Sequence, residues 1–184
     1  MALAAMPAPM LRHSIRTYLL AEAYADAERI DFDREGLAVA SLLHDIALFP
    51  PYCNPRQPFP FNSSRVMLTL LDQHDVPVSR AAALVDAIDF HFQLWPHWQA
   101  GPEAGLLHVG AYMDVFRFRR RRIRNIAAAI EQSYPREGMT KPFIGGVFGC
   151  MGRPVAFFGL FAPGFCQRPH RPVSPPRTNA DTFG

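Results

Sequence analysis

LAVASLLHDI occupies residues 37–46 and ends just after the pair His44 and Asp45. The apolar residues of this stretch recur at the spacing of one helix face, as at Leu37, Ala40 and Leu43. Asp31 or Asp33 is expected to cap the start of the helix, because an aspartate accepts hydrogen bonds from the free N–H groups of a first turn. The stretch therefore predicts an apolar helix that carries a histidine and an aspartate at its C-terminal end.

The segments around this stretch show the same helical periodicity. Residues 8–29 and about 119–133 are expected to form the first and the last clear helix. Three more helices are expected between them, and their expected caps or first residues are Asn62 or Ser63, Ser79 and Pro102. Prolines crowd an irregular loop at 50–61. Five to six helices with no convincing alternating strand predict an all-α fold, a compact helical bundle.

The character of the sequence changes towards the C-terminus. Residues 142–166 are rich in glycine, phenylalanine and proline, with neither a helical nor a strand period. No membrane span is expected there, because Arg153 and Pro154 cut the segment into pieces too short to cross a bilayer. The composition predicts a helical domain over 1–138 and an irregular, poorly ordered tail over 139–184.

The composition is that of a globular domain with a substantial core. Of the 184 residues, 49% are hydrophobic and 19% are charged, which argues against wholesale disorder. The net charge is +3, and six arginines between Arg117 and Arg124 concentrate the basic excess; no nucleic-acid partner is expected from this balance. Three cysteines without a CxxC pair, and an N-terminus without a basic leader, predict a cytoplasmic protein without a signal peptide.

Four side chains are candidate metal ligands. His44 and Asp45 supply an imidazole and a carboxylate, which divalent metals use as ligands, but the remaining ligands must come from other helices. His13 lies inside the first helix, and Asp114 lies in an apolar helical run. A buried carboxylate needs a partner. For Asp114 this partner is either a metal ion or an arginine such as Arg16, which shares a helix face with His13.

The order of these residues resembles a known family. His13, then His44 and Asp45, then Asp114 is similar to the H…HD…D signature of HD-domain metalloproteins. Three local sequences resemble the cyanamide hydratase-like branch of that superfamily: HSIRTY at 13–18, LLHDI at 42–46 and AIDFH at 87–91. The resemblance implies an HD-type helical bundle with one divalent ion held by these four residues. It implies zinc as the expected ion, with iron or manganese as the alternatives.

The resemblance and the chemistry of the ligands predict a metal-dependent hydrolase or hydratase. It would act on a small molecule, such as a nitrile, through a metal-activated water. Asp45 is expected to orient that water, and His91 to transfer a proton, since the unperturbed pKa of histidine lies near neutrality. Arg16, Phe49 and Trp95 are expected to contact the substrate. Self-association of the chain is left open, and no membrane partner is expected.

Two alternatives remain open. An HD phosphohydrolase would use Arg16 and the arginines of 117–124 to bind the phosphate of a nucleotide or another ester. A non-catalytic HD protein would instead serve as a ligand-binding or interaction module. The chain has a second dipeptide of the same kind, His74 and Asp75, which precedes Pro77 in a predicted turn and is interpreted as plain loop.

Overall fold

The structure is a computed structural model that describes residues 2–54 and 56–150. Within these residues every regular element is helical. The α-helices are α1 (Ala8–Glu28), α2 (Arg34–Leu43), α3 (Phe59–Gln73), α4 (Val78–Phe90), α5 (Pro102–Phe116), α6 (Arg124–Ser133) and α7 (Thr140–Cys150). Short 3-10 helices form η1 (Ala2–Ala5), η2 (Ile46–Leu48), η3 (Trp98–Ala100) and η4 (Arg120–Ile123). The predicted all-α fold is confirmed.

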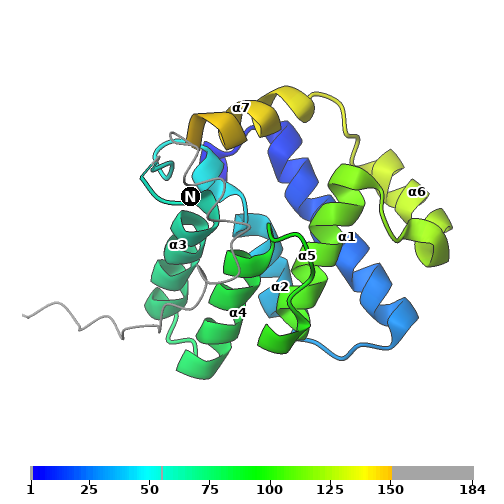
Figure 1. Cartoon of the computed structure of the whole chain (residues 1–184), viewed down its shortest axis with the longest axis horizontal. Coiled ribbons are helices and arrows are strands. Elements are labelled where there is room, and N and C mark those ends of the chain that lie inside the picture. The colour runs from blue at the N-terminus through cyan, green and yellow to red at the C-terminus, as the bar shows by residue number, and fades with distance from the viewer. Residues whose placement is uncertain (1, 55, 151–184) are drawn as a thin grey trace, which may run out of the picture.

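The main core lies between α1, α2, α4 and α5 (Figure 1). Apolar side chains from these helices form one buried cluster, whose members include Leu37, Leu84, Ile88, Leu106 and Leu107. α3 packs on α4, and α6 packs on α1. This arrangement follows from the helical periodicity of the sequence, because each amphipathic helix must bury its apolar face against a neighbour.

α5 contacts α1 closely at Gly110. A Cβ atom at this position would lie 2.3 Å from the backbone O of Thr17 and 2.9 Å from the Cβ of Ala21, so the contact requires a glycine. Asp114 lies one turn further along α5, and His13 lies one turn back along α1. The contact between the two helices therefore brings Asp114 beside His13.

The predicted start of α3 was wrong. The helix begins at Phe59 rather than at Asn62 or Ser63. Pro60 lies in its first turn, where a proline is tolerated because the missing N–H has no helical partner in any case. Ser63 is buried inside the helix, and its Oγ accepts a hydrogen bond from the backbone N of Ala47 at 3.1 Å. The proline-rich loop is therefore shorter than the sequence indicated.

The predicted last helix, over 119–133, is two elements in the structure. Arg119 has a left-handed backbone with φ 58°, so a regular α-helix does not begin there. The chain first forms η4, and α6 then begins at Arg124. Ile123, between the two elements, is buried against α1 and α5 together with Val109 and Met113.

α7 lies in a segment for which the sequence indicated no regular structure. It crosses the end of the bundle at which α1 begins (Figure 1), and it packs on η2 and α1. Val147 is buried, and a Cβ at Gly146 would lie 2.9 Å from the Cβ of Leu48, so the glycine lets α7 approach η2. Residues 151–184 of the predicted tail lie outside the described residues. The domain boundary at residue 138 stays a prediction.

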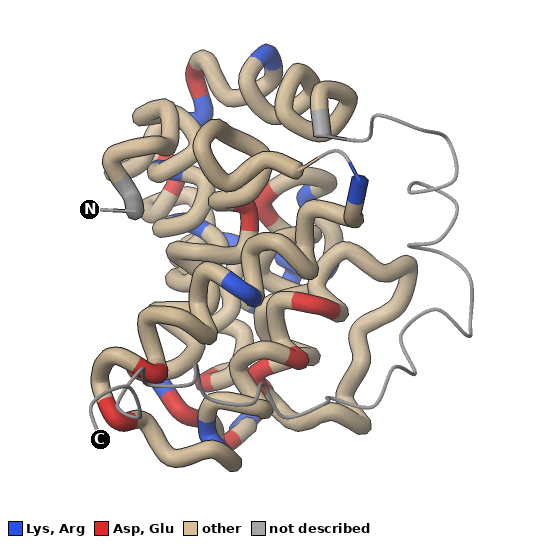
Figure 2. Tube along the Cα trace, turned by 90° about the vertical axis from the view of Figure 1, so that its left-hand side faces the viewer, with Lys and Arg blue, Asp and Glu red and all other residues tan. Residues whose placement is uncertain are grey.

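Acidic and basic residues lie among each other along the chain (Figure 2). Much of the arginine run is paired locally: Arg117 and Arg120 bind Glu131, and Arg122 binds Glu28. These pairs neutralise part of the basic excess, which favours a structural role for the run. That no nucleic acid binds stays a prediction.

One observation bears on the setting of the protein. No helix among the described residues is long and apolar enough to cross a bilayer. The compartment of the protein stays a prediction.

The close contact at Gly110 makes a direct prediction about stability. Gly110→Ala is expected to lower the free energy of unfolding by about 1–3 kcal/mol, because the new methyl group overlaps the backbone of α1. Gly145→Ala is the matched control, since nothing lies within 4 Å of a Cβ at Gly145 in α7. The control is expected to leave stability unchanged or to raise it by up to about 1 kcal/mol. Urea denaturation of both variants measures the difference, and equal effects would contradict the close contact.

Candidate metal centre

His44 and Asp45 lie at the point where α2 ends. His44 is the C-cap of the helix, and Asp45 follows with φ −108° and ψ 8°. Adjacent side chains on a continuing helix point about 100° apart, so the change of backbone direction at Asp45 allows both side chains to face one point. The hydrogen bond from Ala47 to Ser63 of α3 holds the turn that follows.

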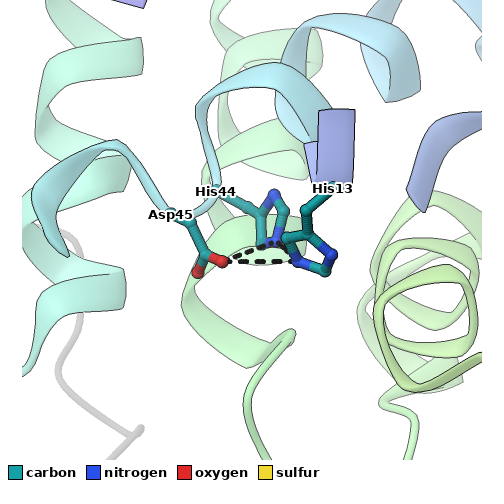
Figure 3. Close-up of side chains that lie close together, drawn as sticks. All are labelled: His13, His44 and Asp45. Atoms are coloured by element: carbon teal, nitrogen blue, oxygen red, sulfur yellow. Dashed lines mark hydrogen bonds and ion pairs between the residues drawn. The ribbon is translucent and has the colours of Figure 1, made fainter. Parts of the chain in front are cut away.

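Three side chains converge at this point (Figure 3). Nε2 of His44 lies 3.3 Å from Oδ2 of Asp45 and 3.3 Å from Nε2 of His13. Nε2 of His13 lies 3.4 Å from the same Oδ2. All three residues are 1% exposed. The structure thus brings together a histidine of α1 and the two residues at the end of α2, and these three are the group able to hold a metal ion.

The histidines at this point have fixed tautomers in their neutral form. Nδ1 of His44 donates to the O of Ser41 at 2.7 Å, and Nδ1 of His91 donates to the O of Ile88 at 2.6 Å. Each Nδ1 must carry a proton, because a carbonyl can only accept. Each Nε2 is left with a lone pair, as a metal ligand or a proton acceptor requires. Nε2 of His91 lies 3.6 Å from Oδ1 of Asp45, so this third ring borders the cluster.

Asp114 directs both oxygens to α1. Its Oδ2 accepts from Nδ1 of His13 at 2.6 Å, and its two oxygens accept from Nε and Nη2 of Arg16, each at 2.8 Å. Nη1 of Arg16 donates to the carbonyls of Tyr134 and Pro135 at 3.0 and 3.2 Å. Of the two partners that the sequence left open for Asp114, the structure shows the arginine. Asp114 as a metal ligand stays a prediction.

The buried charges are balanced around His13. Burial opposes protonation of this ring, but its contacts with Asp114 and Asp45 outweigh burial and raise the pKa of His13 to about 9. Burial also opposes ionisation of Asp45, yet the neighbouring His44, His13 and His91 hold the pKa of that carboxyl well below its usual range. Burial lowers the pKa of His44. The interior thus holds an ionised Asp45, which requires positive charge beside it.

The three converging residues fit a divalent metal ion. Oδ2 of Asp45 is buried, and no hydrogen bond from a described residue reaches it, although Nε2 of His13 and Nε2 of His44 lie 3.4 and 3.3 Å away. Such an oxygen is unfavourably placed unless another group completes it. Ligand atoms at about 2.1 Å from a tetrahedral zinc ion lie about 3.4 Å from one another. The separations of 3.3 and 3.4 Å in the cluster agree with this spacing. Two imidazoles and one carboxylate are a donor set of zinc and of non-haem iron sites.

A cavity of about 80 Å³ adjoins the cluster. His91, the predicted proton-transfer residue, lines it together with His13, His44 and Asp45. The other walls are apolar or aromatic and come from the residue after His91, from α5 and from α7: Phe92, Ala111, Tyr112, Val115, Phe116 and Phe143. No lysine or arginine lines the cavity among the described residues. The cluster therefore faces a small space whose only basic side chains among the described residues are histidines.

The three predicted substrate contacts do not line this cavity. Arg16 is held by Asp114 behind His13. Phe49 belongs to the buried apolar cluster beneath α7, and Trp95 lines a different cavity. The sequence identified the polar residues of the site more accurately than its walls.

Tyr112, Phe116 and Phe143 are wall residues that the sequence reasoning missed. The first two are four residues apart on the helix that carries Asp114, so helical spacing could have indicated them. Phe143 also packs edge-on against His13, with ring centroids 6.1 Å apart. The sequence did not indicate Phe143 as a wall residue, because the helical period of α7 is weak and no helix was predicted there.

The buried Arg16 predicts a large effect on stability. Arg16→Met is expected to lower the free energy of unfolding by about 3–5 kcal/mol, because it removes the two-pronged partner of the buried Asp114 carboxylate and leaves it His13 and the longer contacts with Arg136 and Arg120, at 3.5 and 3.8 Å. Arg34→Met is the control, since Arg34 forms two ion pairs, with Glu22 and Asp26, from a half-exposed surface position. The control should change stability far less. Chemical denaturation compares the two, and similar losses would show that Arg16 is not the dominant partner of Asp114.

Comparison with known proteins places the chain in a family. The HD domain family matches residues 10–116, which is more than half of the 184 residues. The matched span contains His13, His44, Asp45 and Asp114. A search of curated proteins found no match, so the cyanamide hydratase-like branch rests on the local sequences alone. The matched span, the all-helical fold and the grouped histidine and aspartate ligands show that the chain belongs to the HD domain family.

Proposed function

We propose that the protein is a metal-dependent hydratase or hydrolase that acts on a small, uncharged molecule, with a nitrile as the favoured substrate class. Membership of the HD domain family and the cluster of His13, His44 and Asp45 support metal-dependent chemistry. The observation that carries the substrate class is the cavity beside the cluster, which is small and has no lysine or arginine among its described walls.

The size of the cavity favours a substrate group of few atoms. A water molecule takes a share of about 30 Å³ in the liquid, so a space of about 80 Å³ accommodates a water beside a short group such as a nitrile. Aromatic walls from Tyr112, Phe116 and Phe143 suit an uncharged group.

The phosphohydrolase alternative finds less support. A phosphate ester carries negative charge, which binding sites usually balance with arginine or lysine. Arg16, the cation nearest to the cluster in sequence, has its donors committed to Asp114 and to the carbonyls of Tyr134 and Pro135. The arginines of 117–124 do not line the cavity beside the cluster.

His13, His44 and Asp45 would hold the ion, for which zinc is the favoured identity and iron the nearest alternative. A divalent ion in such a site lowers the pKa of a bound water and polarises the bond that the water attacks. Asp114 holds His13 by its Nδ1, so that Nε2 of His13 faces His44 and Asp45, where it would bind the ion. Arg16 in turn holds Asp114 and prevents its carboxylate from turning away.

His91 is the proposed proton-transfer residue. Its Nδ1 is committed to the O of Ile88, so only Nε2 exchanges a proton, and this atom borders Asp45 at the cavity wall. In hydration of a nitrile, the oxygen of water bonds to the carbon and one bond of the triple bond opens. Nε2 of His91 takes one proton that the water releases and returns it to the substrate nitrogen, which gives an imidic acid, and the ring ends as it began. The remaining O–H proton then moves from the oxygen to the nitrogen, so that the C=O bond forms and the product is an amide.

The two HD dipeptides of the chain provide a matched test of the metal site. His44→Ala is expected to lose bound metal, because it removes one of three converging ligands. His74→Ala changes the same residue type in the other dipeptide, where His74 is exposed in the turn after α3, and it should keep the metal content of the parent. Elemental analysis of the purified proteins gives the metal per chain, with circular dichroism as the control for folding. A parent without metal after reconstitution with zinc, iron or manganese would overturn the enzymatic proposal.

A substrate panel tests the proposed reaction. The metal-loaded protein is expected to hydrate small nitriles faster than it hydrolyses phosphate esters, because the cavity has the size and lacks the charge described above. His91→Gln keeps the shape and one polar atom but cannot shuttle a proton, so it should lower kcat by about 100-fold with the metal content unchanged. Preference for phosphate esters would support the phosphohydrolase alternative. A metal-loaded protein inactive on the whole panel would favour the non-catalytic module.

A further inference from the structure

A second and larger cavity lies next to the metal centre. Its volume is about 340 Å³, within the range of small-molecule sites. Tyr112 lines both cavities, so its ring stands between them. Nothing in the proposed reaction uses this second space.

The chain builds the second cavity from three short segments. Trp95 and Pro96 come from the loop after α4, His108 and Tyr112 come from one face of α5, and Phe118 comes from the turn after α5. The His108 and Tyr112 rings are stacked with centroids 4.0 Å apart and planes 22° apart. Tyr112 is anchored by a hydrogen bond from its hydroxyl to the O of Gln93. Half of the lining residues, Trp95, His108, Tyr112 and Phe118, are therefore flat rings, which suit an aromatic ligand.

One permanent cation lines this aromatic cavity. Arg119 is exposed, and no carboxylate within 4 Å pairs with it among the described residues, whereas Arg117, Arg120 and Arg122 all have such partners. Arg119 has a left-handed backbone conformation, and both Arg119 and its neighbour Phe118 line the cavity. A guanidinium without a protein partner beside an apolar space is suited to the acid group of a ligand whose body fills that space.

His108 provides the other polar group of the wall. Its Nδ1 is 3.1 Å from the O of His91, so this contact joins the second cavity to the loop at the metal centre. With Nδ1 committed to a carbonyl, Nε2 is the ring atom available to a ligand.

We propose that the cavity lined by Trp95, Tyr112 and Arg119 is a binding site for a small aromatic carboxylate, separate from the metal centre. The carboxylate pairs with the Arg119 guanidinium, and the aromatic ring packs between Trp95 and Tyr112. Because Tyr112 also lines the metal cavity and His108 contacts His91, an occupied site contacts two residues of the proposed active site without touching the ion. The proposed binding does not require the metal, so a test of this site is independent of a test of the proposed reaction.

Isothermal titration calorimetry of the full chain tests this site with two matched probes. Indole-3-acetate carries the ring and the carboxylate, and indole-3-ethanol carries the same ring without charge. The acid is expected to bind about tenfold more tightly than the alcohol, the loss that one charge-assisted hydrogen-bonded contact typically causes. Equal affinities for the two probes, or no binding of the acid, would overturn the proposal.

Two arginine variants separate the site from general charge attraction. Arg119→Met is expected to abolish the preference for the acid while it keeps the affinity for the alcohol. Arg121→Met removes the same charge from an exposed residue that does not line the cavity, and it should bind both probes as the parent does. Equal losses in the two variants would show nonspecific attraction and would contradict the site.

The two tryptophans of the chain give a second readout. Trp95 lines the cavity, whereas Trp98 packs against Gly105 of α5 and does not line it. In a two-dimensional NMR spectrum, indole-3-acetate is expected to shift the indole N–H signal of Trp95 and to leave that of Trp98 in place. A Trp95→Phe variant assigns the two signals. Shifts of Trp98 alone would place the ligand elsewhere and contradict the proposal.

Discussion

The rest of the site depends on the interaction of the Asp114 carboxylate with Arg16 and His13. The carboxylate is fully buried between α1 and α5, and it is held by Arg16 and by Nδ1 of His13. An isolated buried carboxylate is very costly, so these partners must be present whenever the two helices are packed. The close contact at Gly110, one turn away, sets the distance at which they meet. The packing of α5 on α1 therefore also fixes the orientation of the His13 ring.

The end of α2 completes the site through a change of backbone direction. Two adjacent side chains within a regular helix cannot face one point, but the two side chains at the position where a helix ends can do so. The backbone leaves helical geometry at Asp45, and Ser63 of α3 holds the following turn. His44 and His91 each commit Nδ1 to a carbonyl of their own helix. Three different segments thereby present three Nε2 atoms and one carboxylate to a single buried region, in which no hydrogen bond from a described residue reaches Oδ2 of Asp45.

Tyr112 divides the space beside the cluster into two parts of different chemistry. The small part has apolar walls around the candidate ligands, and the larger part has aromatic walls with Arg119 at its edge. No arginine lines the metal cavity among the described residues, since Arg16 is committed to Asp114 and to two backbone carbonyls, whereas Arg119 lines the neighbouring cavity. This division supports the proposals of an uncharged substrate at the centre and an anionic ligand beside it.

The sequence by itself determined the helical class and the polar residues of the site. The period of the apolar residues indicates α1, α2, α4 and α5, because each must bury one face. The unusual polar residues on or at the ends of these helices are His13, His44, Asp45 and Asp114.

Tertiary structure alone decided what each residue contacts. Whether Arg16 meets a substrate or Asp114, and whether Trp95 meets the metal cavity or another, depends on distances between helices that local periodicity does not encode. The contribution of Phe143 depended on α7, whose glycine-rich sequence has a weak helical period and which packs on η2 through Gly146. Local pattern reflects which face of a helix is buried, whereas the identity of the neighbour is set by packing between segments distant in sequence.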